Sequence, residues 1–332
     1  MTRHCPTFEW EREAPVNPRE ALIREVRRGL FEPPRSLSSW MFYDGCGSRL
    51  FERITELSDY YLTRTERNIL ANFAAAIITR AQGDRSRPLR LVEPGAGTAS
   101  KTAVLLDAVA RLQNEVLYLP VDVSRDALDI ARETITSLLP AVCVEPIVAN
   151  YVTHAPQLES FEGTTLAIYL GSSIGNFSPE EARAILRTLS SQLRSGDALL
   201  LGTDMVKDES ILLAAYNDRE GITAEFNRNL LHRLNRELGA DFDPASFQHR
   251  ALWNGAASRI EMHLVSRHDQ RVRIAPAGLD LHFTAFETIH TENCYKFTRD
   301  AIRTLLEDAG FAVEQSWTDA RDWYAVTLGR VP

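Results

Sequence analysis

Between Leu89 and Thr203, short apolar runs alternate with amphipathic stretches, and this alternation limits the possible fold more than any other feature of the chain. The apolar runs have the length of buried strands, and the stretches between them have helical spacing. Strands that alternate with helices form a parallel sheet covered on both faces. We therefore predict an α/β fold, with strands at 89–93, 116–123, 165–170 and 197–203 and helices at 100–112, 125–138 and 179–193.

Two helix starts in and before this region carry capping signals. Ser178 is followed by Pro179 and, three residues on, by Glu181, which are the residues preferred at the N-cap, first and third helical positions. Thr63 and Glu66 have the spacing of a capping box at the start of a helix expected over 62–82. Both patterns predict helices with sharp N-terminal boundaries.

The alternation stops after Asp204 and is replaced by longer helical stretches and then by period-2 alternation. We interpret this part of the chain as an insertion into the α/β fold. Its expected elements are helices near 208–216 and 221–238 and strand-like runs at 258–265 and 271–284.

The last segment returns to a helix near 298–309 and two strand candidates at 311–317 and 323–329. The connection between these strands is too short for a crossover, so they should pair antiparallel. A parallel sheet that ends in an antiparallel hairpin is the topology of class I (Rossmann-like) methyltransferases. We expect that fold here.

Charge and cysteine spacing exclude several classes of function. The 37 Lys and Arg against 45 Asp and Glu give a net charge of −8, which argues against a nucleic-acid partner. The four cysteines are widely spaced without a Cys-x-x-Cys pair, so neither a metal site nor a disulfide framework is expected. The N-terminus lacks an apolar leader, and no apolar run is long enough to span a membrane. We expect a cytoplasmic monomer whose partner is a small molecule.

A glycine loop connects the first strand of the alternation to the next helix. Gly95 and Gly97 allow the backbone to approach a ligand that a Cβ would block. Asp122 closes the next strand, at the position that binds a ribose diol in nucleoside sites. The loop and the acid together predict a nucleoside cofactor.

Two details of this loop favour S-adenosylmethionine over NAD. The third glycine of the dinucleotide fingerprint, which packs the helix beneath a pyrophosphate, is replaced by Ser100. Glu93 adds negative charge that would repel a pyrophosphate and suits a sulfonium or ammonium group. The alternative for Glu93 is a structural role as a capping or ion-pairing acid at a strand end.

Stretches in a shared order over almost the whole chain resemble the histidine-specific methyltransferases that form trimethylhistidine (hercynine) in ergothioneine biosynthesis. The two most specific are Gly171-Ser-Ser-Ile-Gly-Asn176 and Ala224-Glu-Phe-Asn-Arg-Asn229. The full set is Tyr43–Glu52, Tyr60–Glu66, Glu93–Lys101, Asp122–Ser124, Gly171–Asn176, Thr203–Asp208, Tyr216–Asp218, Thr223–Asn229 and Thr291–Lys296.

The resemblance implies a methyltransferase that uses S-adenosylmethionine and methylates the α-amine of L-histidine. It implies a methyltransferase core from 70–204 and 296–332 and a second, α+β substrate-binding domain from 1–69 and 205–295. The cofactor-binding residues that it implies, with Gly97 added from the same loop, are Tyr60, Gly95, Gly97, Lys101, Asp122, Asn150 and Tyr151.

The resemblance also implies a substrate site. Asn176 and Tyr216 would bind the α-amino acid end of histidine and so act in catalysis, with Tyr43 and Thr223 nearby. We also assign Tyr43 to catalysis, because its ring can stabilise a methylated ammonium. The implied residues of the imidazole pocket are Met262, Glu292 and Cys294.

This chain departs from the family pattern at two places. Family members commonly carry Asp-Phe or Asp-Tyr where this chain has Asn150-Tyr151, and an amide can both donate to and accept from adenine. At position 294 the family usually has serine, and the thiol of Cys294 is a weaker hydrogen-bonding group than a hydroxyl.

Other functions remain open on the sequence alone. The nearest is the same transfer to another small amine, such as tryptophan. An NAD-dependent oxidoreductase is disfavoured by Ser100 and Glu93. A non-catalytic binding protein is a further alternative if Asn150 and Cys294 reflect loss of activity.

Overall fold

The computed structural model describes residues 17–84, 86–99, 101–149 and 158–332. The chain divides into two compact units. The core unit comprises 62–206 and 296–332, and the second unit comprises the residues up to Tyr61 together with 207–295. The first division falls before the expected 69/70, because helix α3 (Tyr61–Gln82) is continuous across that position.

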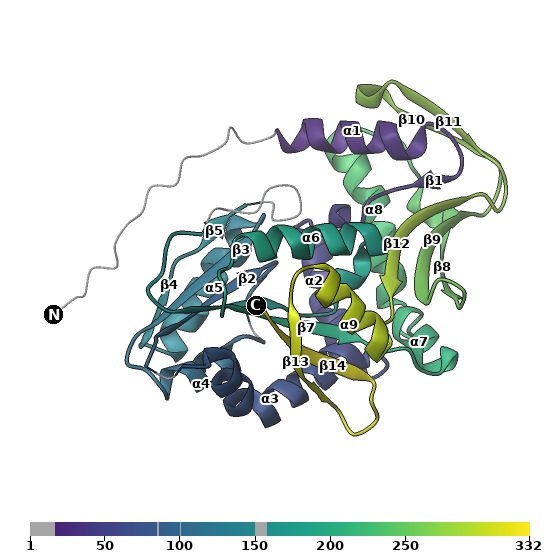
Figure 1. The fold of residues 1–332 in the computed structure, drawn as a ribbon. Helices are drawn as coiled ribbons and strands as arrows, with labels where there is room; N and C mark the ends of the chain where they lie inside the picture. Colours follow the sequence, from purple (N-terminus) through teal and green to yellow (C-terminus); the bar gives the residue numbers. More distant parts are fainter. Residues whose placement is uncertain (1–16, 85, 100, 150–157) are drawn as a thin grey trace. The chain divides into compact units, whose positions relative to one another are not determined.

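The core unit is built on one mixed sheet, in the order β13-β14-β7-β6-β2-β3-β4, with β5 beside β3. All neighbours from β7 to β4 are parallel, whereas β14 is antiparallel to both β7 and β13 (Figure 1). The expected class I sheet with its terminal hairpin is therefore confirmed. The strands are β2 (Leu89–Pro94), β3 (Val116–Asp122), β4 (Val142–Val144), β5 (Ile147–Val148), β6 (Thr164–Tyr169), β7 (Ala198–Asp204), β13 (Ala312–Thr318) and β14 (Tyr324–Arg330).

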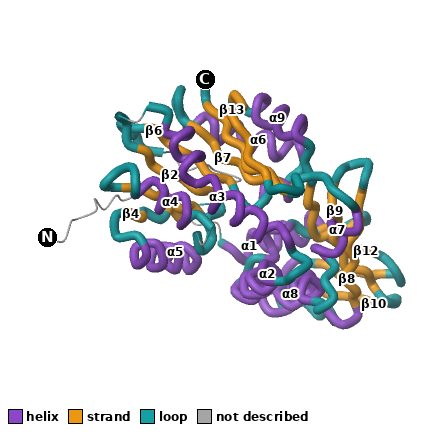
Figure 2. Tube along the Cα trace, turned by 90° about the horizontal axis from the view of Figure 1, so that it is seen from below, coloured by secondary structure: helices purple, strands orange, loops and turns teal. Residues whose placement is uncertain are grey.

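The helices of the core unit cover both faces of this sheet. Figure 2 shows α6 and α9 on one side of the strands and α5 on the other. Arg183 of α6 donates from Nε to Asp308 of α9 over 2.9 Å, which joins the two helices on their shared side. Besides α3, the helices are α4 (Ala103–Ala110), η2 (Ser173–Asn176), α5 (Arg125–Leu138), α6 (Pro179–Ser191) and α9 (Arg299–Asp308).

One of the two expected caps is confirmed and the other is wrong. Ser178 and Glu181 form a reciprocal capping box at the start of α6, with Pro179 at the first position. Thr63 lies inside α3, which begins at Tyr61, and Glu66 is fully buried. The Glu66 carboxylate accepts its hydrogen bonds from residues distant in sequence, so it does not cap its own helix.

The second unit has a four-stranded sheet in the order β1-β12-β9-β8 and a separate hairpin, β10–β11. The expected strand over 271–284 is wrong, because the backbone turns at Ala275–Gly278, where Gly278 has a φ of +67°. The strands are β1 (Arg35–Ser36), β8 (Phe247–Asn254), β9 (Arg259–Ser266), β10 (Gln270–Ile274), β11 (Leu279–Phe283) and β12 (Thr288–Tyr295).

The helices of the second unit come from both of its chain segments. α8 is the longest of them and buries one face, including Phe226, Leu230 and Leu234. The helices are α1 (Pro18–Leu30), η1 (Ser39–Phe42), α2 (Gly45–Glu56), α7 (Glu209–Tyr216), α8 (Ile222–Leu238), η3 (Pro244–Ser246) and η4 (Ala275–Ala277).

The two places where the insertion leaves and rejoins the core unit are joined to each other. Lys296 Nζ lies 2.8 Å from Asp204 Oδ2, and both side chains are buried. Phe297 donates its backbone N–H to the Asp204 carbonyl, and Val206 donates to the Phe297 carbonyl. Met205 and Phe297 form a parallel bridge. Entry and exit of the insertion thus lie side by side at the end of β7.

Two further observations concern the sequence expectations. Within the described residues, no helix combines the length and apolar composition needed to cross a membrane. Cys46 and Cys294 are free thiols.

Candidate active site

The glycine loop begins where β2 ends, and its backbone is held by the next strand. Gly95 and Gly97 have φ values of +70° and +53°, in the left-handed region that favours glycine. The N–H of Gly97 donates to Asp122 Oδ2 over 2.9 Å, and the N–H of Ser124 donates to Oδ1 over 2.9 Å. Asp122 is therefore oriented at the end of β3 by two backbone donors.

These residues fit the nucleoside part of S-adenosylmethionine. A Cβ added to Gly97 would meet no atom within 4 Å, so the space beside this backbone is open. A carboxylate has about four acceptor positions, and two of those on Asp122 remain for a ribose diol after the backbone bonds are made. The structure thus brings Gly95, Gly97 and Asp122 together as the sequence predicted.

The carboxyl group of Glu93 is hydrogen-bonded inside the core unit rather than exposed at this loop. Its carboxyl group is buried, and it accepts hydrogen bonds from the Thr102 hydroxyl over 2.7 Å and from the Tyr118 hydroxyl. Burial raises the pKa of Glu93 from 4.5 to about 7, against the hydrogen bonds, which lower it. These bonds give Glu93 a structural role that joins β2, β3 and the start of α4 through hydroxyl groups, rather than through a helix cap or an ion pair.

The raised pKa of Glu93 predicts a specific pH dependence of stability. Between about pH 4.5 and 7 the unfolded chain loses this proton and the folded chain keeps it, so the free energy of unfolding falls as pH rises. The difference of pKa corresponds to at most about 3 kcal/mol, at ~1.4 kcal/mol per pH unit. Urea unfolding of wild type and Glu93→Gln near pH 5 and near pH 8 should show a fall that the variant lacks. Parallel pH dependence of the two proteins would contradict this.

Lys101 and Asn176 follow two neighbouring turns of the core unit. Lys101 lies after the glycine loop, with its Nζ 2.8 Å from Glu66 Oε2. Asn176 ends η2, after a sharp turn in which Gly171 and Ser172 both have positive φ. The Ser172 hydroxyl accepts from the backbone N–H of Asp204 over 2.9 Å. Both expected residues therefore lie at the carboxyl ends of β2 and β6.

In the second unit the expected tyrosines belong to one chain of contacting rings. Tyr43 packs edge-on against Phe51 at 5.8 Å, Phe51 against Tyr60 at 6.3 Å, and Tyr60 against Tyr216 at 6.3 Å between ring centroids. Tyr60 and Tyr216 are buried, whereas Tyr43 is 44% exposed. Tyr60, which the resemblance assigns to the cofactor, thus contacts Tyr216, which the resemblance assigns to the substrate.

The three residues assigned to the imidazole share one face of the second sheet. Glu292 of β12 lies directly opposite Met262 of β9, and Cys294 follows two residues along the same strand. A bulge between His290 and Glu292 shifts the alternation. Glu292, Met262 and Cys294 are consequently all buried, at 7%, 1% and 6% exposure.

Thr223, Asn150 and Tyr151 complete the residues predicted from the sequence. Thr223 is buried in the first turn of α8 and donates its backbone N–H to Asp218 over 2.8 Å. Asn150 and Tyr151 lie outside the described residues.

Sequence reasoning gave no role to the two asparagines in the Ala224–Asn229 stretch. Asn227 donates from Nδ2 to His249 Nδ1 over 2.9 Å, and His249 Nε2 in turn donates to the Tyr216 carbonyl over 2.9 Å. Burial lowers the pKa of His249, which keeps the ring neutral for this pair of bonds. Asn227 thus connects α8 through His249 to the carbonyl of Tyr216.

Asn229, the second asparagine, supports the residue next to Tyr43. It donates from Nδ2 to Asp44 Oδ1 over 2.9 Å, and Arg236 pairs with the other oxygen. Asp44 also accepts from the backbone N–H of Gly47 over 2.6 Å and so caps α2. Asn227 thus acts through His249 on the Tyr216 carbonyl, whereas Asn229 holds the side chain of Asp44, the residue after Tyr43.

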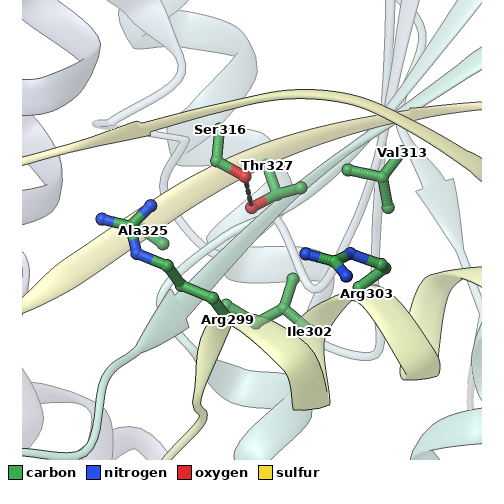
Figure 3. Close-up of a pocket in the computed structure, with 7 residues that line it drawn as sticks. All are labelled: Arg299, Ile302, Arg303, Val313, Ser316, Ala325 and Thr327. Atoms are coloured by element: carbon green, nitrogen blue, oxygen red, sulfur yellow. Dashed lines mark hydrogen bonds between the residues drawn. The ribbon is translucent and has the colours of Figure 1, made fainter.

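A separate pocket of the core unit contains none of the predicted residues. Figure 3 shows it between α9 and the hairpin β13–β14, with Arg299 and Arg303 at its edge. The hydroxyls of Ser316 and Thr327 are 2.9 Å apart in its wall. Arg299 is paired with Asp322, and Arg303 lies 3.6 Å from Asp300. The pocket therefore lacks the open loop and the oriented acid of the glycine site.

Comparison with known proteins agrees with the sequence resemblance. The family model for histidine-specific, S-adenosylmethionine-dependent methyltransferases matches residues 22–331. The chain is 41% identical over 309 residues to a histidine N-alpha-methyltransferase of Mycolicibacterium smegmatis, covering 93% of this chain and 94% of that protein. The corresponding enzyme of Mycobacterium tuberculosis is 40% identical over 308 residues, with the same coverage of each chain.

A more distant relative is a longer protein. The ergothioneine biosynthesis protein 1 of Neurospora crassa is 26% identical over 314 residues, which covers 89% of this chain and 33% of the fungal protein. The family model and the bacterial relatives extend over nearly all of the present sequence, through both the core unit and the second unit. This chain therefore belongs to the family of histidine-specific, S-adenosylmethionine-dependent methyltransferases.

Proposed function

We propose that this protein transfers methyl groups from S-adenosylmethionine to the α-amine of L-histidine. The product is Nα,Nα,Nα-trimethyl-L-histidine (hercynine), and the reaction is the first step of ergothioneine biosynthesis. The observation that carries the proposal is the 41% identity to a histidine N-alpha-methyltransferase over 93% of this chain. We place the enzyme in the cytoplasm as a monomer, with the core unit binding the cofactor and the second unit binding the side chain of the substrate.

S-adenosylmethionine, when bound, supplies a methyl group already activated by its sulfonium leaving group. The work left to the protein is to hold the cofactor and to present a neutral amine in line with the methyl carbon. We assign the first task to Gly95, Gly97, Lys101 and Asp122, with Tyr60, Asn150 and Tyr151. Asp122 is suited to the ribose because Gly97 and Ser124 orient its carboxylate.

We assign the α-amino acid end of histidine to Asn176, Tyr216 and Tyr43, with Thr223 beside them. An α-amine with a pKa of about 8 is mostly protonated at neutral pH, so these residues must bind its minor, neutral form or accept its proton. Correct alignment of the amine contributes up to about 7–11 kcal/mol to lowering the barrier. The exposed ring of Tyr43 can stabilise the growing ammonium by a cation–π contact of ~0.5–2 kcal/mol.

Selectivity for histidine follows from the face shared by Met262, Glu292 and Cys294. A neutral imidazole offers one N–H donor and one acceptor nitrogen. Glu292 accepts from the donor, and the thiol of Cys294 faces the acceptor. An indole could donate to Glu292 but has no acceptor for Cys294, and a phenyl ring would leave the buried acid without a substrate partner.

The direct test is an assay with S-adenosylmethionine and each of histidine, tryptophan and phenylalanine, followed by mass spectrometry. We expect histidine to gain three methyl groups and the two other amino acids to react at least about a hundredfold more slowly, since each leaves polar groups of the pocket unpaired. Equal rates on phenylalanine and histidine would contradict the polar pocket. Methylation of tryptophan alone would favour the alternative substrate.

Cys294 provides a prediction about the departure from the family. Cys294→Ser should lower the KM for histidine by up to about tenfold, because a hydroxyl makes the stronger hydrogen bond to the ring nitrogen. Affinity for S-adenosylmethionine should not change. Histidine should also slow alkylation of the wild-type thiol. A cysteine that only fills space would give an unchanged KM and unchanged labelling.

A further inference from the structure

Glu66 is a fully buried acid that accepts hydrogen bonds from three different elements of the core unit. Its Oε2 lies 2.8 Å from Lys101 Nζ. Its Oε1 accepts from the backbone N–H of Gly171 over 2.7 Å and from the Tyr324 hydroxyl over 2.6 Å. One carboxylate on α3 thus connects the end of the glycine loop, the turn before η2 and strand β14.

The surroundings of Glu66 are built to leave it this position. A Cβ on Gly202 of β7 would collide with Glu66 Oε1 and would lie 2.9 Å from the Tyr324 hydroxyl. A Cβ on Gly171 would lie 3.1 Å from Lys101 Nζ. Since a side chain at either position would displace the carboxylate or the amine, these glycines make room for the Glu66–Lys101 pair.

The pair constrains two residues of the proposed function. The amine of Lys101 is paired with Glu66, and the Lys101 side chain is one-quarter exposed. The amine is therefore held in place and is still accessible to a ligand. Gly171 begins the turn that leads to Asn176, and its N–H is fixed by the same carboxylate. A buried charge is costly unless it is paired, which makes the pairing at Glu66 obligatory.

We propose that Glu66 is a positioning residue for methyl transfer. Through Oε2 it holds the Lys101 amine for the cofactor, and through Oε1 it holds the turn that carries Asn176. The inference rests on the proposed function for the roles of Lys101 and Asn176. It explains why an acid stands at this place in α3, where the sequence had predicted a helix cap.

The experiment is a double-mutant cycle on the full chain, with S-adenosylmethionine affinity measured by calorimetry in the absence of histidine. Glu66→Gln keeps an oxygen for Gly171 and Tyr324 and removes the attraction for Lys101. It should weaken S-adenosylmethionine binding about tenfold in the wild-type background. In a Lys101→Met background the same substitution should have no further effect, because the residue through which it acts is gone.

Kinetics separate the two oxygens of Glu66. Glu66→Gln should raise the KM for S-adenosylmethionine with kcat largely retained, whereas Glu66→Ala, which also frees the Gly171 N–H, should lower kcat as well. Tyr324→Phe is the matched control, since it removes a donor to Oε1 without altering Lys101 or Gly171. It should leave S-adenosylmethionine affinity within about twofold of wild type.

Three results would overturn the inference. One is an equal loss of affinity from Glu66→Gln in both backgrounds, and another is no loss in either. The third is a loss in Tyr324→Phe as large as that in Glu66→Gln. If Glu66→Gln does not fold, Glu66→Asp, which keeps the charge one methylene further from Lys101, is measured against the same criteria. A protein that binds S-adenosylmethionine but methylates a different amine would overturn the proposed substrate and leave this cycle valid.

Discussion

Replacing Asp122 by alanine should weaken the binding of S-adenosylmethionine by at least about a hundredfold, which is the larger of the two strongest effects that we expect. The variant removes two charge-assisted hydrogen bonds to the ribose, each worth ~1.5–3 kcal/mol. It also leaves the N–H groups of Gly97 and Ser124 without their acceptor. Calorimetry with S-adenosylmethionine measures the loss directly.

A control for charge is available nearby. Asp126→Ala removes an exposed acid from the first turn of the following helix, α5, and should leave cofactor affinity unchanged. Asp122→Asn, which keeps one oxygen acceptor, should fall between wild type and alanine. If Asp122→Ala bound S-adenosylmethionine as tightly as wild type, the ribose would have to be bound elsewhere.

Replacing Glu292 by alanine should raise the KM for histidine by about 10- to 100-fold, because a hydrogen bond to an ionised group contributes ~1.5–3 kcal/mol. S-adenosylmethionine affinity should stay at the wild-type value, since Glu292 belongs to the second unit and the glycine loop belongs to the core unit. Steady-state kinetics with varied histidine, together with calorimetry for the cofactor, measure both quantities.

The matched control for this variant is Asp280→Ala, which removes an exposed acid from β11 of the same unit. Its KM for histidine should equal that of wild type. Relative activity on phenylalanine is the second measurement, because loss of the buried acid removes the penalty for a side chain without an N–H. A Glu292→Ala enzyme with an unchanged KM would exclude Glu292 from the substrate site.

The sheet of the core unit could be predicted because its signal is local. The buried parallel strand β7 begins with a continuous apolar run, Ala198–Leu201, and helices such as α5 and α6 have caps and regular spacing. In the second unit, the segment 271–284 alternates with period 2 in its two halves, 271–274 and 279–284, on either side of Ala275-Pro-Ala-Gly278. The turn at Ala275–Gly278, which splits it into a hairpin, is set by a single glycine with positive φ.

The roles of the buried acids could not be predicted because their partners are far away in sequence. Thr63 and Glu66 satisfy the capping pattern, yet Glu66 bonds to Gly171 and Tyr324, which are 105 and 258 residues further along the chain. Glu93 stands directly before the glycine loop, where an acid can face a cofactor. Its hydrogen bonds with Tyr118 and Thr102 determine where the carboxyl group points. The local spacing of residues indicates which side chains can cap a helix. It carries no information on which donors from distant parts of the chain will bond to a buried acid.

The junction of Asp204, Met205, Val206, Lys296 and Phe297 has a consequence for how such an enzyme can diversify. The segment 207–295 leaves and rejoins the core unit at adjacent positions that are bonded to each other. It therefore connects β7 to α9 in the way that a short loop would. Its interior can change in length or sequence without altering the strand order of the core unit, as is typical of tolerated domain insertions. If the second unit binds the substrate as proposed, the recognised amine can change while the core unit is inherited intact, provided that the buried Asp204–Lys296 pair is preserved.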